Sequence, residues 1–102
     1  MTDEHLIFVG RLGREPELKY TYKGSVPICF LSVAHNQVGI AKTIWRRVVV
    51  FGKQAELAKV WLKKGSQVFV QGTTTMQEYP DKDSGTKFIE EVTAQLIGFA
   101  HL

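Results

Sequence analysis

Aromatic rings and cations lie at alternate positions of one stretch, residues 43–53 (TIWRRVVVFGK). Most of its residues are β-branched or aromatic and none is proline, so the stretch predicts a strand. Side chains alternate between the two faces of a strand, which puts Trp45, Arg47 and Phe51 on one side. Rings beside cations on a solvent-facing surface can stack nucleobases while the cations hold phosphates. The alternative is a core position for both rings, with Arg47 reaching past them to water.

Other residue combinations that could do chemistry are badly spaced. Cys29 and His35 would lie about 20 Å apart along one strand, too far for a nucleophile and its base. The adjacent Glu90 and Glu91 would face opposite sides of a strand, where we expect solvated or interface charges. The histidines show no metal-ligand spacing. The sequence therefore predicts no enzyme active site, no metal and no cofactor, and it makes Cys29 a small buried thiol.

The bulk composition fits one folded domain over residues 1–102. Hydrophobic residues make up 44% of the chain, so disorder is not expected. A net charge of +3 and a pI near 9.1 give mild support to a polyanionic partner. A single cysteine suits a reducing compartment. No apolar run approaches bilayer length and the acidic start is not a signal sequence, so we expect no membrane association.

The elements that would position the aromatic residues follow from alternation and turn signals. Strands are predicted at residues 5–12, 18–22, 26–36, 43–53, 67–76 and 87–97, with a helix at 54–64 and a hairpin loop at 79–85. Gly65 is expected to end the helix in a left-handed conformation. Gly10 predicts a bulge or a close backbone approach. Five main strands with one short helix between the third and fourth predict an all-β oligonucleotide/oligosaccharide-binding (OB) barrel, although other small barrels share the count.

Three stretches resemble the bacterial and mitochondrial single-stranded-DNA-binding protein family. They are VGRLGREPELKY (9–20), WRRVVVFGKQAELA (45–58) and LKKGSQVFVQG (62–72). The resemblance covers nearly the whole chain in the family's order. It implies an OB-fold that binds single-stranded DNA without strong sequence preference, in replication, recombination and repair. The rivals are a PriB-type replication-restart (primosomal) protein and an OB domain that binds only protein or sugar.

The resemblance also implies site residues, one position at a time. Trp45 and Phe51 fall where the family stacks bases, and Tyr79 takes the place of another stacking ring, in the loop after the fourth strand. Arg46 falls at an assembly-interface position. The cations expected near the DNA path are Arg47, Lys53, Lys64, Arg11 and Lys19. Two further contacts are expected at Tyr22 and Lys87.

Assembly and location are expected to follow the family. The apolar stretch at residues 6–9 lies near a chain end and predicts an unpaired strand edge, which invites pairing with a second copy. The resemblance implies a homotetramer, or a dimer, with DNA crossing several subunits. It also implies a cytoplasmic, nucleoid-associated protein, or a mitochondrial-matrix protein if a transit peptide has been removed.

The sequence departs from the family in three places. The loop after the second main strand offers only Val38 where a third stacking tryptophan is common. Residues 73–77 are neutral where relatives carry a basic run. One lost stacking platform should weaken binding by about tenfold or more. The sequence also ends at Leu102 without the family's linker and acidic tip, so we expect no partner recruitment through such a tail.

Overall fold

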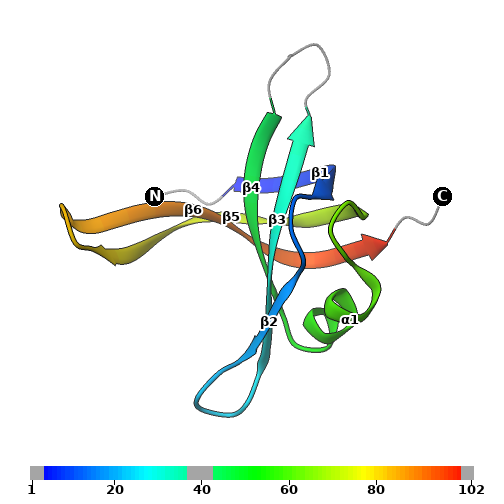
Figure 1. Ribbon diagram of the computed structural model, residues 1–102, viewed down its shortest axis with the longest axis horizontal. Coiled ribbons are helices and arrows are strands. Elements are labelled where there is room, and N and C mark those ends of the chain that lie inside the picture. The colour runs from blue at the N-terminus through cyan, green and yellow to red at the C-terminus, as the bar shows by residue number, and fades with distance from the viewer. Residues whose placement is uncertain (1–3, 37–42, 100–102) are drawn as a thin grey trace.

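The computed structural model describes residues 4–36 and 43–99 (Figure 1). Within these residues the chain forms six strands and one helix. They are β1 (Glu4–Leu12), β2 (Glu17–Tyr20), β3 (Pro27–Asn36), β4 (Thr43–Phe51), α1 (Lys53–Trp61), β5 (Gln67–Asp81) and β6 (Gly85–Phe99). No helix in the described part of the chain is long and apolar enough to cross a membrane.

The strands close into a ring. β1 pairs with β5, β5 with β6, β6 with β4, and β4 with β3. Of the pairings within the described residues, only that of β4 with β6 is parallel. β1 returns to β3 at Arg11 and Leu12, which closes the ring. β2 pairs with the other end of β3, so β1 and β2 act as two halves of one interrupted strand. Counted this way, five strands with the helix between the third and fourth form an OB barrel, as predicted.

The barrel core comes from alternate residues of each strand. Val48 and Val50 of β4 are fully buried, as are Val68 and Val70 of β5, which confirms the predicted inward faces. Cys29 of β3 is fully buried among them, and burial raises the pKa of its thiol to about 11. A protonated, buried thiol is a poor nucleophile, in agreement with the small structural role expected for it.

The structure confirms the role predicted for Gly10 and contradicts the one predicted for Gly65. A Cβ atom at Gly10 would collide with the backbone of Ala34 on β3, so Gly10 permits a close approach of the two strands, as expected. Gly65 does not end the helix, and that prediction is wrong. The helix ends at Trp61, and Gly65 lies in a later turn with a φ of 90°, donating its N–H to the Leu12 carbonyl at 2.8 Å.

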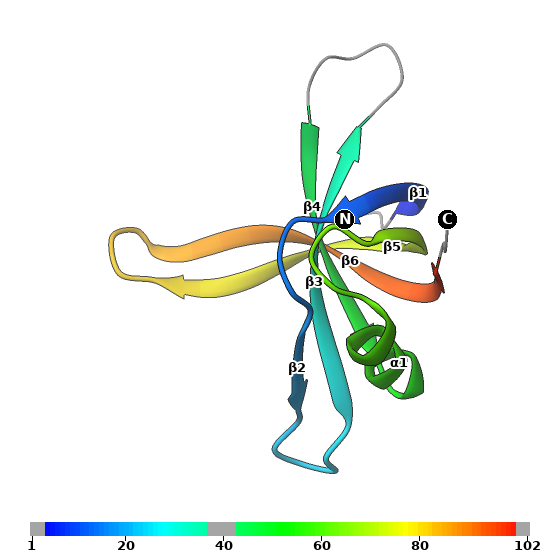
Figure 2. The same cartoon turned by 45° about the vertical axis from the view of Figure 1, so that its right-hand side comes forward.

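β5 and β6 extend past the barrel as a two-stranded ribbon (Figure 1, Figure 2). β1 pairs with β5 only as far as Thr74, and β4 pairs with β6 only from Glu91 to Thr93. Among the described residues, residues 76–90 therefore pair only with each other. We call this ribbon the arm.

The arm corrects the predicted hairpin loop at residues 79–85. The ladder continues to the pair of Asp81 and Gly85, and the turn itself contains only residues 82–84. Pro80 indicated a loop because proline cannot donate to a central sheet ladder. Each strand of a two-stranded ribbon keeps one edge open to solvent, however, where a missing N–H costs nothing.

Candidate nucleic-acid interface

One outer face of the barrel gathers the predicted stacking residues. In the β3–β4 ladder Trp45 lies opposite Ala34, Arg47 opposite Ser32, and Phe51 opposite Ile28. Residues opposite each other in an antiparallel pair project to the same side of the sheet. Trp45 is 60% exposed and Phe51 is 46% exposed, so the alternative of core positions for the two rings is wrong. We call this surface the aromatic face; its members are Trp45, Arg47, Phe51, Phe30 and Tyr79.

The indole ring of Trp45 lies over the backbone of Gly13, in the loop that follows β1. A Cβ atom built on Gly13 would overlap the far edge of the ring. The N–H of Gly13 donates to the Ser32 carbonyl of β3 at 2.9 Å, which fixes the loop beneath the ring. The ring can therefore take this position only because residue 13 has no side chain.

Phe30 of β3 lies in the middle of the aromatic face, and the sequence did not single it out. The Nζ atom of Lys19 lies 5.8 Å from the centroid of its ring, and the Cζ atom of Arg47 lies 5.3 Å from it. Cations at these distances are attracted to the ring. Lys19 also pairs with Glu17 at 2.9 Å. Alternation with the buried Cys29 was the signal that could have placed Phe30 on this face.

A buried carboxylate lies beneath the aromatic face. Glu91 of β6 is 5% exposed, so the expectation of a solvated or interface charge is wrong for this residue. Its Oε2 atom accepts a hydrogen bond from Arg47 Nε at 2.6 Å and another from the Tyr79 hydroxyl at 2.7 Å. The hydrogen bond to Glu91 raises the pKa of Tyr79, so its hydroxyl stays a donor at neutral pH.

Tyr79 belongs to the arm rather than to a loop. It lies on β5 opposite Lys87 of β6, so the two side chains share one face of the arm. The Cζ atom of Arg47 lies 5.5 Å from the centroid of the Tyr79 ring. The structure thus brings the predicted residues Tyr79 and Arg47 together, with Lys87 directly across the arm from Tyr79.

The remaining predicted contacts lie around this surface. Arg11 of β1 is opposite Ala34, in the same row as Trp45, and its Nη1 atom donates to the Gly65 carbonyl at 3.1 Å. Lys53 is exposed at the first turn of α1. Lys64 is exposed in the turn that follows the helix.

The structure differs from the prediction at Tyr22 and does not describe Val38. Tyr22 was predicted at the end of a strand, but β2 ends at Tyr20 and Tyr22 lies fully exposed in the following turn. It stands beyond the last paired residues of β2 and β3, apart from the ladder that carries the aromatic face. Val38 falls in residues 37–42, outside the described residues.

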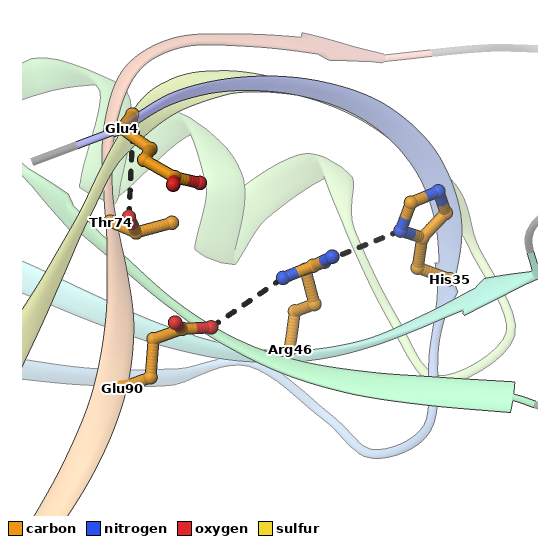
Figure 3. Close-up of polar contacts among 5 residues, drawn as sticks. All are labelled: Glu4, His35, Arg46, Thr74 and Glu90. Atoms are coloured by element: carbon orange, nitrogen blue, oxygen red, sulfur yellow. Dashed lines mark hydrogen bonds and ion pairs between the residues drawn. The ribbon is translucent and has the colours of Figure 1, made fainter.

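The other side of β4 carries a second cation. Figure 3 shows the Nε atom of Arg46 donating to Nδ1 of His35 at 3.3 Å and its guanidinium pairing with Glu90 at 3.6 Å. The Arg46 Cζ atom lies 5.5 Å from the centroid of the Phe8 ring, which stacks on His35. Burial and the charge of Arg46 lower the pKa of His35, so its ring accepts this hydrogen bond in the neutral form. The assembly role expected for Arg46 stays a prediction.

Within residues 4–36 and 43–99, no group of three or more histidine, cysteine, aspartate or glutamate residues could hold a metal ion. The aromatic face presents rings, with guanidinium and ammonium groups beside them. These groups suit a ligand with flat bases and negative charges.

Comparison with known proteins points the same way. The chain is 34% identical over 103 residues to the "Single-stranded DNA-binding protein" of Xylella fastidiosa, covering 91% of this chain and 62% of that protein. It is 36% identical over 102 residues to the "Single-stranded DNA-binding protein" of Xanthomonas campestris pv. campestris, covering 91% of this chain and 59% of that protein. The chain thus spans about three fifths of the length of these relatives. Residues 3–100 match the Single-strand binding protein family. The chain belongs to that family.

Proposed function

We propose that this chain binds single-stranded DNA on the aromatic face and acts by binding, without catalysis. The observation that carries the proposal is the pair of exposed rings, Trp45 and Phe51, on one face with Arg47. Base stacking on rings contributes roughly 1–3 kcal/mol per base and tolerates any sequence, because every base has a π-face. Membership of the family supports the same ligand.

In this proposal the strand crosses the barrel wall and continues onto the arm. Bases stack on Trp45, Phe51 and Tyr79, with Phe30 as a further ring between them. Phosphates lie near the cations that border this path, which are Arg11, Lys19, Arg47, Lys53, Lys64 and Lys87. Neutral residues at 73–77 leave the base of the arm with little attraction for phosphates. A role in replication, recombination and repair follows from protection of exposed strands.

We also propose assembly through β1. One edge of β1 pairs with β5. On its other edge only Arg11 and Leu12 pair with β3, so in the described structure the rest of that edge is unpaired. Ile7 and Val9 are exposed on this strand. Pairing of two such edges would bury these side chains and form a dimer, and two dimers would form the tetramer. A tetramer would let one DNA strand contact several aromatic faces and multiply weak contacts.

The test is a titration of tryptophan fluorescence with oligo-dT, combined with light scattering. A Trp61→Phe variant leaves Trp45 as the sole tryptophan, so quenching then reports stacking on the aromatic face. We expect strong quenching and an affinity that falls with salt, with a slope of roughly −0.7 per phosphate neutralised. An unquenched signal with a flat salt response would favour a domain that binds only protein or sugar. A monomeric mass at micromolar concentration would overturn the assembly proposal alone.

The replication-restart alternative is left with less support. Its tail-less, dimeric OB-fold would also show single-strand binding, so fluorescence alone does not separate the two. The family match over residues 3–100 favours the single-strand binder. A dimer that does not grow into a tetramer on binding long oligo-dT would favour the alternative.

A further inference from the structure

Glu91 joins the barrel wall to the arm through a single oxygen atom. In the parallel pairing of β4 with β6 it lies opposite Arg47, and its Oε2 atom accepts from both Arg47 Nε and the Tyr79 hydroxyl. Arg47 belongs to the barrel and Tyr79 to the arm, so this one oxygen fixes the junction between them. The carboxylate itself is covered, because only 7% of its side chain is exposed.

The contact leaves most of the Arg47 guanidinium available. An arginine has five N–H donors, and the ion pair with Glu91 is made through the one on Nε. The Cζ atom lies 5.3 Å from the Phe30 centroid and 5.5 Å from the Tyr79 centroid, and 43% of the side chain is exposed. The Nη groups, which make no hydrogen bond within the described residues, are therefore held between two rings with a route to solvent.

We propose that Glu91 is a positioning residue of the DNA interface. It orders Arg47 and Tyr79 before DNA arrives, so that Phe30, the guanidinium and Tyr79 form one continuous platform from the barrel to the arm. Side chains that are already ordered lose less conformational entropy on binding, which raises affinity. This inference rests on the proposed function of the aromatic face.

Simple charge counting predicts the opposite effect of Glu91. A negative charge beside a site for polyanions lowers the local potential, so its removal should tighten DNA binding and steepen the salt dependence. If Glu91 positions Arg47 and Tyr79, its removal should weaken binding despite the gain in positive charge. The sign of the change therefore distinguishes the two roles.

Two substitutions with the same charge make the test. In Glu91→Gln the amide oxygen can still accept from both donors, as Oε2 does, while the charge is lost. In Glu91→Leu the charge and the acceptor are both lost in a side chain of similar size. We expect Glu91→Gln to bind oligo-dT at least as tightly as the wild type. We expect Glu91→Leu to bind about tenfold more weakly than Glu91→Gln, the effect of one poorly ordered stacking platform.

Controls separate positioning from general effects of charge and folding. Glu78→Leu removes an exposed acid from the opposite face of the arm and should not weaken binding. Melting curves by circular dichroism report folding, because removing one partner of a buried ion pair can be strongly destabilising. Should Glu91→Leu fail to fold, Tyr79→Phe keeps the ring and removes only the hydroxyl donor. We expect it to bind severalfold more weakly, and unchanged binding would overturn the inference.

The outcomes are distinguishable. A wild type that does not bind oligo-dT overturns the proposed function and this inference together. A wild type that binds, with Glu91→Leu as tight as Glu91→Gln, overturns the positioning role alone. A loss confined to Glu91→Leu, rescued by the conservative Glu91→Gln, supports it, because a merely electrostatic role would move both variants equally.

Discussion

Arg46 and Arg47 are neighbours on β4, yet the two sides of the strand use them in opposite ways. Each guanidinium lies over an aromatic ring and pairs with one of two neighbouring acids of β6. The Arg46 side chain is 14% exposed and its partner Glu90 is 57% exposed. The Arg47 side chain is 43% exposed and its partner Glu91 is 7% exposed. One side buries the cation and exposes the acid; the other buries the acid and exposes the cation.

This difference shows that burial, more than residue type, determines which charged group of an ion pair is accessible to a ligand. On the Arg46 side the cation is engaged with His35 and Phe8, and the group that reaches water is a carboxylate. On the Arg47 side the carboxylate is covered and the guanidinium reaches water beside exposed rings. We therefore expect a polyanion to favour the second side.

Trp45→Ala should give the largest loss of DNA affinity. The ring is the most exposed aromatic of the aromatic face, and one stacking platform contributes roughly 1–3 kcal/mol, about fivefold to 150-fold in affinity. Trp61→Ala is the matched control, because Trp61 is similarly exposed but lies on α1. Fluorescence polarisation of labelled oligo-dT measures both. Equal losses of affinity in the two variants would show that Trp45 is not part of the interface.

Alanine substitutions of the two arginines should differ in their effect on DNA binding. Arg47→Ala should weaken oligo-dT binding by about tenfold, because it removes the proposed phosphate contact and part of the stacked platform. It should also lower the melting temperature, since it leaves the buried Glu91 carboxylate without its cation. Arg46→Ala should lower the melting temperature by several degrees without this loss of affinity, since it removes a half-exposed ion pair, a hydrogen bond and a ring contact. The contrast between the two sides of β4 fails if Arg46→Ala, measured below its melting temperature, loses as much affinity as Arg47→Ala.

Gly13→Ala should weaken binding by a few fold without unfolding the protein. The added methyl group meets only the far edge of the Trp45 ring, which can swing away at little cost to the fold. A displaced ring stacks less well on a base. Because both substitutions act through one ring, Gly13→Ala should have no further effect in a Trp45→Ala background. Additive losses would show that Gly13 contributes in some other way.

The smallest effect should be a pH dependence of stability from His35. Burial and the charge of Arg46 lower the pKa of this residue in the folded state, so the unfolded state takes up protons more readily. Its contribution is therefore complete above the ordinary histidine pKa of about 6.5 and is lost as the pH falls through the lower folded value. Between pH 7.5 and pH 5 the wild type should lose more of its melting temperature than His35→Gln. Parallel curves of melting temperature against pH for the two proteins would contradict this account. The DNA affinity of the folded protein should not follow either of these curves.

Local patterns were enough to predict the strands and to put Trp45 and Phe51 on one face, while the family resemblance was needed to choose the outward position for the two rings. Alternation of β-branched and aromatic residues fixes which side chains of a strand share a face, and it needs no knowledge of the partner strand. Val48 and Val50 point inward for this reason, while Trp45 and Phe51 point outward. The order of the strands and the helix then selects the fold class.

Pairing between distant segments could not be predicted in this way. The sequence correctly put Glu90 and Glu91 on opposite faces, but the burial of Glu91 depends on the parallel pairing of β6 with β4. The same limit applies to the arm, where Pro80 and its polar neighbours have the composition of a loop while the ladder continues through them. Phe30 was missed because its importance comes from Lys19 and Arg47, which reach it from other strands.

The seam between β4 and β6 has a consequence for how the protein folds. It consists of parallel pairing at Arg47, Val48 and Val49, with partners from Glu91 to Thr93. β3 and β4 can pair as soon as both have left the ribosome, but the ring cannot close until β6 has been synthesised. Such distant contacts form late, because the entropy of closing a long loop opposes them. Arg47 gains its carboxylate only at that step, so barrel closure and competence to bind are expected to arise together.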